Sequence, residues 1–170
     1  MHEKILGSPS SIFALALSYL AAGLSVIPVR TDGSKAPRIP DWRVFSDRRP
    51  TASELREWFA CSSAGIGILG GPASGNLVVF DFEEWVAFQS WGDRLSEDDR
   101  SLLARCPVVR TPSGGAHVYC RLAEPVRGAR YAKDAVGECL IETRGDGQFV
   151  VAPGLAGLLP PEWPPLRAHA

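Results

Sequence analysis

The sequence has almost no net charge, and this argues against a protein that binds polyanions through a strongly basic overall charge. Its 18 Lys and Arg residues nearly balance its 19 Asp and Glu residues, so the formal net charge is −1. A chain of this kind has no global attraction to nucleic acid or to an anionic membrane. Any site for a polyanion must therefore come from local clustering of Lys and Arg.

A metal-binding cysteine pattern is also missing. The four cysteines contain no CxxC pair, and their spacing is too irregular for a zinc site or a compact disulfide framework. We therefore expect no zinc, and we expect reduced, mostly buried thiols, as in a cytoplasmic protein. The cysteines are Cys61, Cys106, Cys120 and Cys139.

No apolar run is long and continuous enough to span a membrane. The segment 12–29 carries no charge and follows Lys4, which gives it some likeness to a signal peptide. It is interrupted by Ser18, Gly23 and Pro28, so only its first half is continuously apolar. We expect a cytoplasmic protein without membrane contact.

Several nucleotide and hydrolase motifs are absent. There is no GxxxxGK[ST], which excludes a P-loop enzyme, and no GxSxG nucleophile elbow. The stretch "GIGILG" at 65–70 has dinucleotide-fingerprint spacing, but that motif needs a strand before it and a helix within it, whereas a helix precedes and a strand follows here. His2 and His169 lie at the termini, so His117 is the one credible general base.

What is present predicts one compact α+β domain. The chain has 170 residues, of which 45% are hydrophobic, and this is enough for a substantial core. Capping signatures at Thr51/Glu54 and Ser96/Asp99 mark two of the expected helices. We expect a mixed or antiparallel central sheet with flanking helices. Helices are expected over 8–23, 51–59, after 84 and over 96–106, and strands over 24–29, 65–69, 76–82, 107–111, 117–122, 138–143 and 148–153.

Two segments outside these elements have a distinctive composition. Residues 30–50 form a long charged loop, and loops of this length are often functional. Residues 156–170 are Pro-rich and predict a tail or linker to a downstream region, which leaves 1–155 as the domain. The loop interleaves the basic residues Lys35, Arg38, Arg43, Arg48 and Arg49 with Trp42 and Phe45.

Two carboxylates end an apolar strand in "LVVFDFEEW". Asp81 and Glu83 are two residues apart, so both side chains leave the same face of the strand while Phe82 points into the core. Like charges in that position repel each other unless a cation lies between them, and a hard divalent ion held by oxygen ligands is the obvious candidate. The alternative is an acidic strand end that faces water or an Arg partner.

A third acid follows another apolar strand in "CLIETRG". If this strand lies beside the first, Glu142 joins Asp81 and Glu83, and the three carboxylates can hold two metal ions roughly 4 Å apart for phosphoryl or nucleotidyl transfer. The alternative for Glu142 is a surface residue paired with Arg144.

The segment "VVRTPSGGAHVYC" predicts a hairpin with anion-binding character. Gly114 and Gly115 free the backbone to approach an anion closely, Ser113 offers a hydroxyl, and His117 opens the next strand. Arg110 and Arg144 are candidate neutralising charges. The alternative is an ordinary β-hairpin with a structural histidine.

Together, these motifs resemble the archaeo-eukaryotic primase superfamily. "VVFDFE" (78–83) resembles its first metal motif, "RTPSGGAHVY" (110–119) its second, nucleotide-contacting motif, and "LIETRGDGQFVVAPG" (140–154) its third. The order of parts is similar to the bifunctional primase–polymerase domain at the N-terminus of plasmid and phage replication proteins, over roughly 12–154. The resemblance implies the superfamily's RRM-like core.

The resemblance also implies roles for individual residues. Asp81, Glu83 and Glu142 would ligate two Mg²⁺ or Mn²⁺ ions, while His117 would contact the phosphates of an incoming NTP or dNTP. Single-stranded DNA template would lie along the basic and aromatic loop, and a downstream helicase or helix-bundle region would be a partner. Further nucleotide contacts would come from Ser113, Gly114, Gly115, Lys35, Arg110 and Arg144.

Two other functions compete with a primase–polymerase. A metal-dependent nuclease could use Asp81 with Glu142–Arg144 as a distorted Asp…Glu-x-Lys site, although the missing Lys and the paired Asp81 and Glu83 argue against it. A domain that binds nucleotide or single strands without turnover is the non-catalytic alternative, and the intact acids argue against that.

Overall fold

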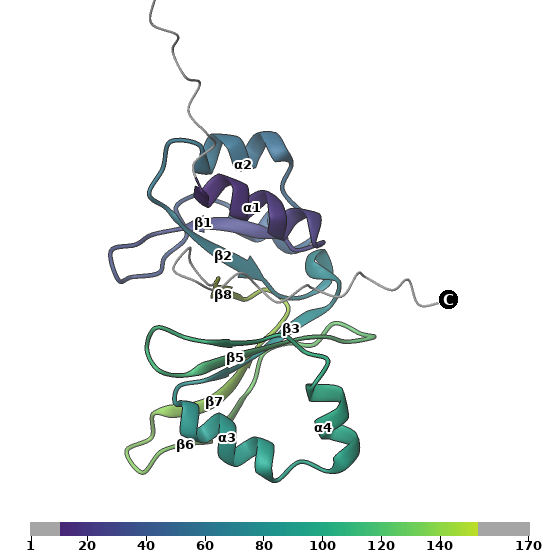
Figure 1. Ribbon diagram of the computed structural model, residues 1–170. Coiled ribbons are helices and arrows are strands. Elements are labelled where there is room, and N and C mark those ends of the chain that lie inside the picture. Colours follow the sequence, from purple (N-terminus) through teal and green to yellow (C-terminus); the bar gives the residue numbers. More distant parts are fainter. Residues whose placement is uncertain (1–10, 153–170) are drawn as a thin grey trace, which may run out of the picture.

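The computed structural model, which describes residues 11–152, contains two antiparallel β-sheets with helices beside them (Figure 1). The upper part of Figure 1 holds the sheet β1-β2-β8, and the lower part holds the sheet β4-β5-β3-β7-β6. We call these parts the three-stranded lobe and the five-stranded lobe. The expected α+β class with antiparallel pairing is thus confirmed, with the strands divided between two sheets.

The three-stranded lobe is built mostly from the first half of the chain, and β8 returns to it from the far end of the sequence. Its elements are α1 (Ser11–Ala21), β1 (Val26–Val29), the 3₁₀ helix η1 (Trp42–Ser46), α2 (Ala52–Phe59), β2 (Gly65–Leu69) and β8 (Phe149–Val151).

The five-stranded lobe follows the short 3₁₀ helix η2 (Pro72–Ser74). Its elements are β3 (Leu77–Phe82), α3 (Trp85–Asp93), α4 (Glu97–Leu103), β4 (Val108–Arg110), β5 (Ala116–Arg121), β6 (Arg130–Lys133) and β7 (Cys139–Arg144).

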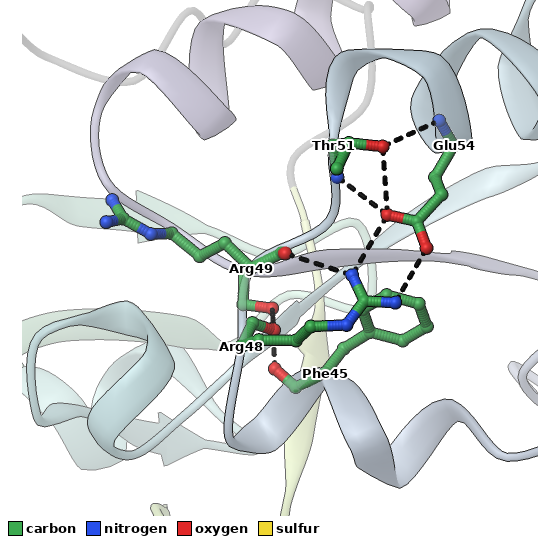
Figure 2. A network of polar contacts seen from close by, with 6 residues as sticks. Phe45, Arg48, Arg49, Thr51 and Glu54 are labelled. Carbon is green, nitrogen blue, oxygen red and sulfur yellow. Dashed lines mark hydrogen bonds and ion pairs between the residues drawn. The ribbon is translucent and has the colours of Figure 1, made fainter.

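Local sequence signals place the helix ends of the three-stranded lobe. Gly23 has φ +78°, and its N–H donates to the Leu20 carbonyl while that of Leu24 donates to the Tyr19 carbonyl, so α1 ends in a Schellman motif. Thr51 and Glu54 form the expected capping box at the start of α2. Figure 2 shows that the Arg48 guanidinium joins this box by donating to both oxygens of Glu54.

One hydrophobic core joins the two lobes. Leu77, Val79, Val109 and Tyr119 of the five-stranded lobe are buried in the same cluster as residues of α1, α2, β1, β2 and β8. The other face of the five-stranded sheet packs against α3 and α4 through a second cluster centred on Phe82. Each strand of this sheet therefore divides its side chains between a helix-covered face and a face that meets the other lobe.

Two connections between the lobes cross each other closely. The β2–β3 connection passes the β7–β8 connection at Gly70, whose N–H donates to the Gln148 carbonyl. A Cβ added at Gly70 would lie 2.4 Å from the Gly145 carbonyl oxygen, so only glycine permits this approach.

Most expected strands are confirmed, and β6 is the one that the sequence pattern missed. Its sequence "RYAK" is mostly exposed and has no apolar alternation, as suits an edge strand. The cysteines are free, as expected, but Cys61 is exposed and the other three are half-buried, so the expectation of mostly buried thiols is wrong. Among residues 11–152, no helix has the length and apolar character needed to cross a membrane.

Candidate active site

The centre of the site is set by the pairing of β3 with its two neighbours. Asp81 on β3 lies opposite His117 on β5 and opposite Glu142 on β7. Residues paired directly across antiparallel strands point to the same face of the sheet. The three side chains therefore form a row across the middle of the five-stranded sheet, although they are far apart in the sequence.

The imidazole of His117 lies between two polar partners. Its Nε2 is 3.3 Å from Asp81 Oδ1, and its Nδ1 is 3.1 Å from the phenolic oxygen of Tyr119, with which it shares a hydrogen bond. The side chain of His117 is only 11% exposed. Burial raises the pKa of the Tyr119 phenol, so this partner keeps its proton across the physiological range.

Glu142 is buried, and it is paired with two arginines. Its side chain is 11% exposed, Arg144 donates a hydrogen bond to Oε1, and Arg130 Nε lies 3.7 Å from Oε2. The pairing with Arg144 considered from the sequence is present, but Glu142 is not a surface residue. The carboxylate faces Asp81 across the β3–β7 ladder while its charge is balanced by cations from β6 and β7.

A cavity of about 770 Å³ opens beside this row. Asp81, Glu83 and His117 line it on the side of the five-stranded sheet, and Lys35 lines it from the long loop of the other lobe. Glu142 is not part of the wall, whereas its partner Arg144 is. Other lining residues are Trp42, Arg110, Ser113, Gln148 and Phe149.

The glycine turn before His117 is shaped by backbone packing. Gly114 has φ +97°, and a Cβ on Gly115 would lie 2.0 Å from the Phe82 carbonyl oxygen. The N–H groups of Gly114 and Gly115 donate to the carbonyl and the hydroxyl of Thr111. These glycines therefore bring the hairpin close to the end of β3, and Ser113 lines the cavity together with Thr111 and Pro112 of the same turn.

Arg110, one of the predicted nucleotide-binding cations, does not point toward the row of Asp81, His117 and Glu142. It alternates with Val109, the partner of His117, so it leaves the opposite face of β4. Its guanidinium carbon lies 4.7 Å from the ring centroid of Trp85, the first residue of α3. Arg110 therefore borders the cavity while its charge rests on an aromatic ring.

The chemistry of the three acids suits a hard divalent cation, because Mg²⁺ and Mn²⁺ prefer carboxylate oxygens. In the described part of the chain, however, no group of three or more His, Cys, Asp or Glu side chains is arranged to hold a metal ion. The carboxylate of Glu142 is instead paired with Arg144 and, at 3.7 Å, with Arg130. The donor types of the three acids fit such an ion.

Two residues of the site were not foreseen from the sequence. Tyr119 is two residues after His117 on the same strand, so strand alternation places both on one face, and this signal was available. Arg130 lies on the unpredicted edge strand β6, opposite Glu142, and no local pattern marks it.

Comparisons with known proteins identify the family. A search of curated proteins gave no match. The family model described as "Bifunctional DNA primase/polymerase, N-terminal" matches residues 16–157, which include both sheets, the cavity and all the residues of the row. Since the match covers most of the chain, this protein belongs to the bifunctional DNA primase/polymerase family and represents its N-terminal domain.

Proposed function

We propose that this domain joins nucleotides on a single-stranded DNA template by a two-metal mechanism, making primers and extending them. The observation that carries the proposal is the β5–β3–β7 register, which aligns His117, Asp81 and Glu142 on one sheet face beside a cavity. Family membership supports primase or polymerase activity in general, and the register is the basis on which we propose the residues.

The volume and charge of the cavity suit a nucleoside triphosphate. A volume of about 770 Å³ lies within the range of small-molecule sites. Acids on one wall and Lys35 and Arg144 elsewhere on the lining give it both signs of charge. Acids can hold metal ions on the wall of the five-stranded sheet, and the cations and Ser113 can bind phosphate oxygens.

Each residue then has a distinct task. Asp81, Glu83 and Glu142 would hold two Mg²⁺ or Mn²⁺ ions, which supply charge neutralisation and a lowered pKa for an attacking 3′-hydroxyl. His117 would donate a hydrogen bond from Nε2 to a phosphate oxygen. Lys35 would bind the phosphates from the opposite lobe, so both lobes contact the same nucleotide.

In this scheme, the two arginines that pair with Glu142 balance its negative charge while no metal is bound. Three acids crowded on one face repel one another, and Arg144 and Arg130 neutralise the least exposed of them. On metal binding, Arg144 would be released toward the cavity that it already lines, where it can contact a phosphate.

A primer-extension assay tests the proposal. The purified protein is given single-stranded DNA, Mn²⁺ or Mg²⁺ and labelled NTPs or dNTPs, with and without a primer. We expect elongated products from the wild type, none from Asp81→Asn, and wild-type amounts from Glu84→Gln. Glu84 is a matched control because it is exposed and makes no side-chain cap for α3.

The same assay separates the competing functions. Shortened template that disappears in Asp81→Asn would identify a metal-dependent nuclease and contradict the proposal. Nucleotide binding without either product would identify a non-catalytic domain.

The remaining proposals concern context. We assign residues 1–155 to the catalytic domain, and 156–170 to a linker toward a downstream helicase or helix-bundle region in the cytoplasm. The tail lies outside the described residues. The segment 30–50 is not one continuous loop, because it contains η1, in which Phe45 is buried, and because Arg48 is paired with Glu54. The part of it that would contact the template is the Trp42–Arg43 pair, in which the Arg43 guanidinium lies 4.7 Å from the ring centroid.

A further inference from the structure

We infer that Tyr119 is a positioning residue that holds His117 in the Nε2–H tautomer, with Nε2 on the side of Asp81 and the cavity. This inference deepens the proposed function and rests on it for the catalytic consequence. The tautomer itself is inferred from two contacts of the metal-free site, to Tyr119 and to Asp81, and it can be measured without any reaction.

The two nitrogens of His117 face different chemistry. Nε2 lies 3.3 Å from a carboxylate oxygen of Asp81, and a carboxylate only accepts hydrogen bonds. A lone pair on Nε2 would face this negative charge unfavourably, so the proton belongs on Nε2. In a neutral ring Nδ1 is then the acceptor, and the Tyr119 hydroxyl at 3.1 Å is its donor.

The position of Tyr119 makes it a rigid partner. It is 2% exposed and belongs to the core cluster shared by the two lobes. Its backbone is held by β5, and it pairs across the sheet with Val79. Its ring meets that of His117 nearly edge-on, with an interplanar angle of 74°. Packing that stabilises the fold thereby also orients the imidazole.

The consequence concerns nucleotide binding. A phosphate oxygen needs a hydrogen-bond donor, and only the Nε2–H tautomer offers one at the cavity side of a neutral ring. Without the phenol, Nδ1 would be a buried acceptor without this donor, and the proton could move to it. Tyr119 thus acts on the nucleotide through His117, without touching the nucleotide.

Nitrogen-15 NMR of histidine tests the tautomer directly. The chain has three histidines, and the other two lie near the termini, so the His117 signals can be assigned with His117→Gln as reference. We expect the wild type to show a protonated Nε2 and an unprotonated Nδ1. A wild-type spectrum with the proton on Nδ1 overturns the inference without any Tyr119 variant.

Tyr119→Phe tests the positioning role, with Tyr131→Phe as the control because Tyr131 is 65% exposed on β6. We expect Tyr119→Phe to move the Nδ1 signal and to raise the KM for nucleotide about 5-fold to 10-fold, roughly one hydrogen bond, with little change in kcat. Tyr131→Phe should change neither, and a thermal melt should show both variants folded.

The outcomes separate this inference from the proposed function. An unchanged Nδ1 signal and KM in folded Tyr119→Phe would overturn the positioning role while leaving polymerase activity intact. If the wild type makes no product, the proposed function fails, and the NMR measurement still decides the tautomer.

Discussion

The two ends of one sheet face have opposite tasks. Leu77 and Val79 on β3 lie under the three-stranded lobe and are 1% exposed, whereas Asp81, the next residue on that face, has a side chain 19% exposed and lines the cavity. On β5, buried Tyr119 and cavity-lining His117 repeat this division. On each strand, the buried core residue and the cavity-lining residue are only two positions apart, since strand alternation keeps both on one face.

The two ends of this sheet face differ in whether they pack directly against the three-stranded lobe. Where α1 and the three-stranded sheet reach the five-stranded sheet, apolar side chains are buried in a shared core. Farther along the same face, polar side chains border a cavity whose lining also includes Lys35 and Phe149 of the three-stranded lobe. Substitutions at the two ends should therefore give separable effects on activity and on unfolding.

The largest effect is expected for Glu83→Gln. Glu83 is exposed and lines the cavity, so its loss should leave the free energy of unfolding within about 0.5 kcal/mol of the wild type. Loss of a metal ligand should lower kcat/KM in primer extension about 1000-fold. Urea unfolding measures the free energy of unfolding, and primer-extension kinetics measure kcat/KM. Comparable losses in the neighbouring Glu84→Gln would contradict the assignment.

The opposite result is expected for Leu77→Ala. This buried side chain belongs to the core that joins the lobes, and its truncation should cost about 2–5 kcal/mol of unfolding free energy. Below its melting temperature the variant should extend primers with a kcat/KM within about 3-fold of the wild type, because Leu77 does not line the cavity. A 3-fold change corresponds to only about 0.6 kcal/mol in the activation free energy. Urea unfolding and extension at low temperature provide the test. A stable but inactive Leu77→Ala would contradict the separation.

The crossing between the lobes should tolerate no side chain at Gly70. Gly70→Ala places a Cβ against the Gly145 carbonyl, and we expect a loss of about 1–3 kcal/mol from the forced backbone shift. Gly92→Ala is the matched control, because Gly92 is in α3 with nothing within 4 Å of an added Cβ, and we expect a gain of about 0.5–1 kcal/mol there. Thermal unfolding shows whether each substitution lowers or raises the stability of the protein. Similar melting temperatures would show that the crossing can relax.

The smallest effect is expected in the capping network of Figure 2. Hydrogen bonds from Arg48, and then from the backbone and side chain of Thr51, lower the pKa of Glu54 from its ordinary value of 4.5 to about 2. A pKa lowered by folding stabilises the native state above the unfolded value, and this contribution is lost as the pH falls from about 4.5 to about 2.

Glu54→Gln should therefore lower stability by about 1 kcal/mol at pH 7, and the difference from the wild type should shrink at pH 3. Urea unfolding at both pH values measures it. Glu57 is exposed on the same helix, and the stability difference between Glu57→Gln and the wild type should not depend on pH in this way. A difference for Glu54→Gln that is equal at both pH values would contradict the role of the ion pair.

Local patterns predicted most of the elements but not their arrangement. The apolar runs gave β2 and β3 within a residue or two, and the capping signature gave α2. The edge strand β6 escaped because its side chains are mostly exposed and follow no apolar alternation. The division into two sheets could not be predicted either, because β8 pairs with β2 across a sequence separation that no local pattern records.

For the site, the sequence predicted which residue types mattered and not how they would be engaged. The motifs indicated Asp81, Glu83, His117 and Glu142, and the structure places three of them in a row and the fourth on the cavity wall. Arg130 at Glu142 was not foreseen, because it depends on an edge strand, and Arg110 turned toward Trp85 because of its strand parity.

By itself the sequence determined the properties that depend on neighbours along the chain: the capped start of α2, the Gly23 stop of α1 and the closeness of Asp81 and Glu83, which both line the cavity. The tertiary structure decided which strands lie side by side, and so brought Glu142 and His117 to Asp81. The physical reason is that strand register and sheet partners are chosen by burial of apolar faces over long sequence distances, and this choice is made only when the whole core packs.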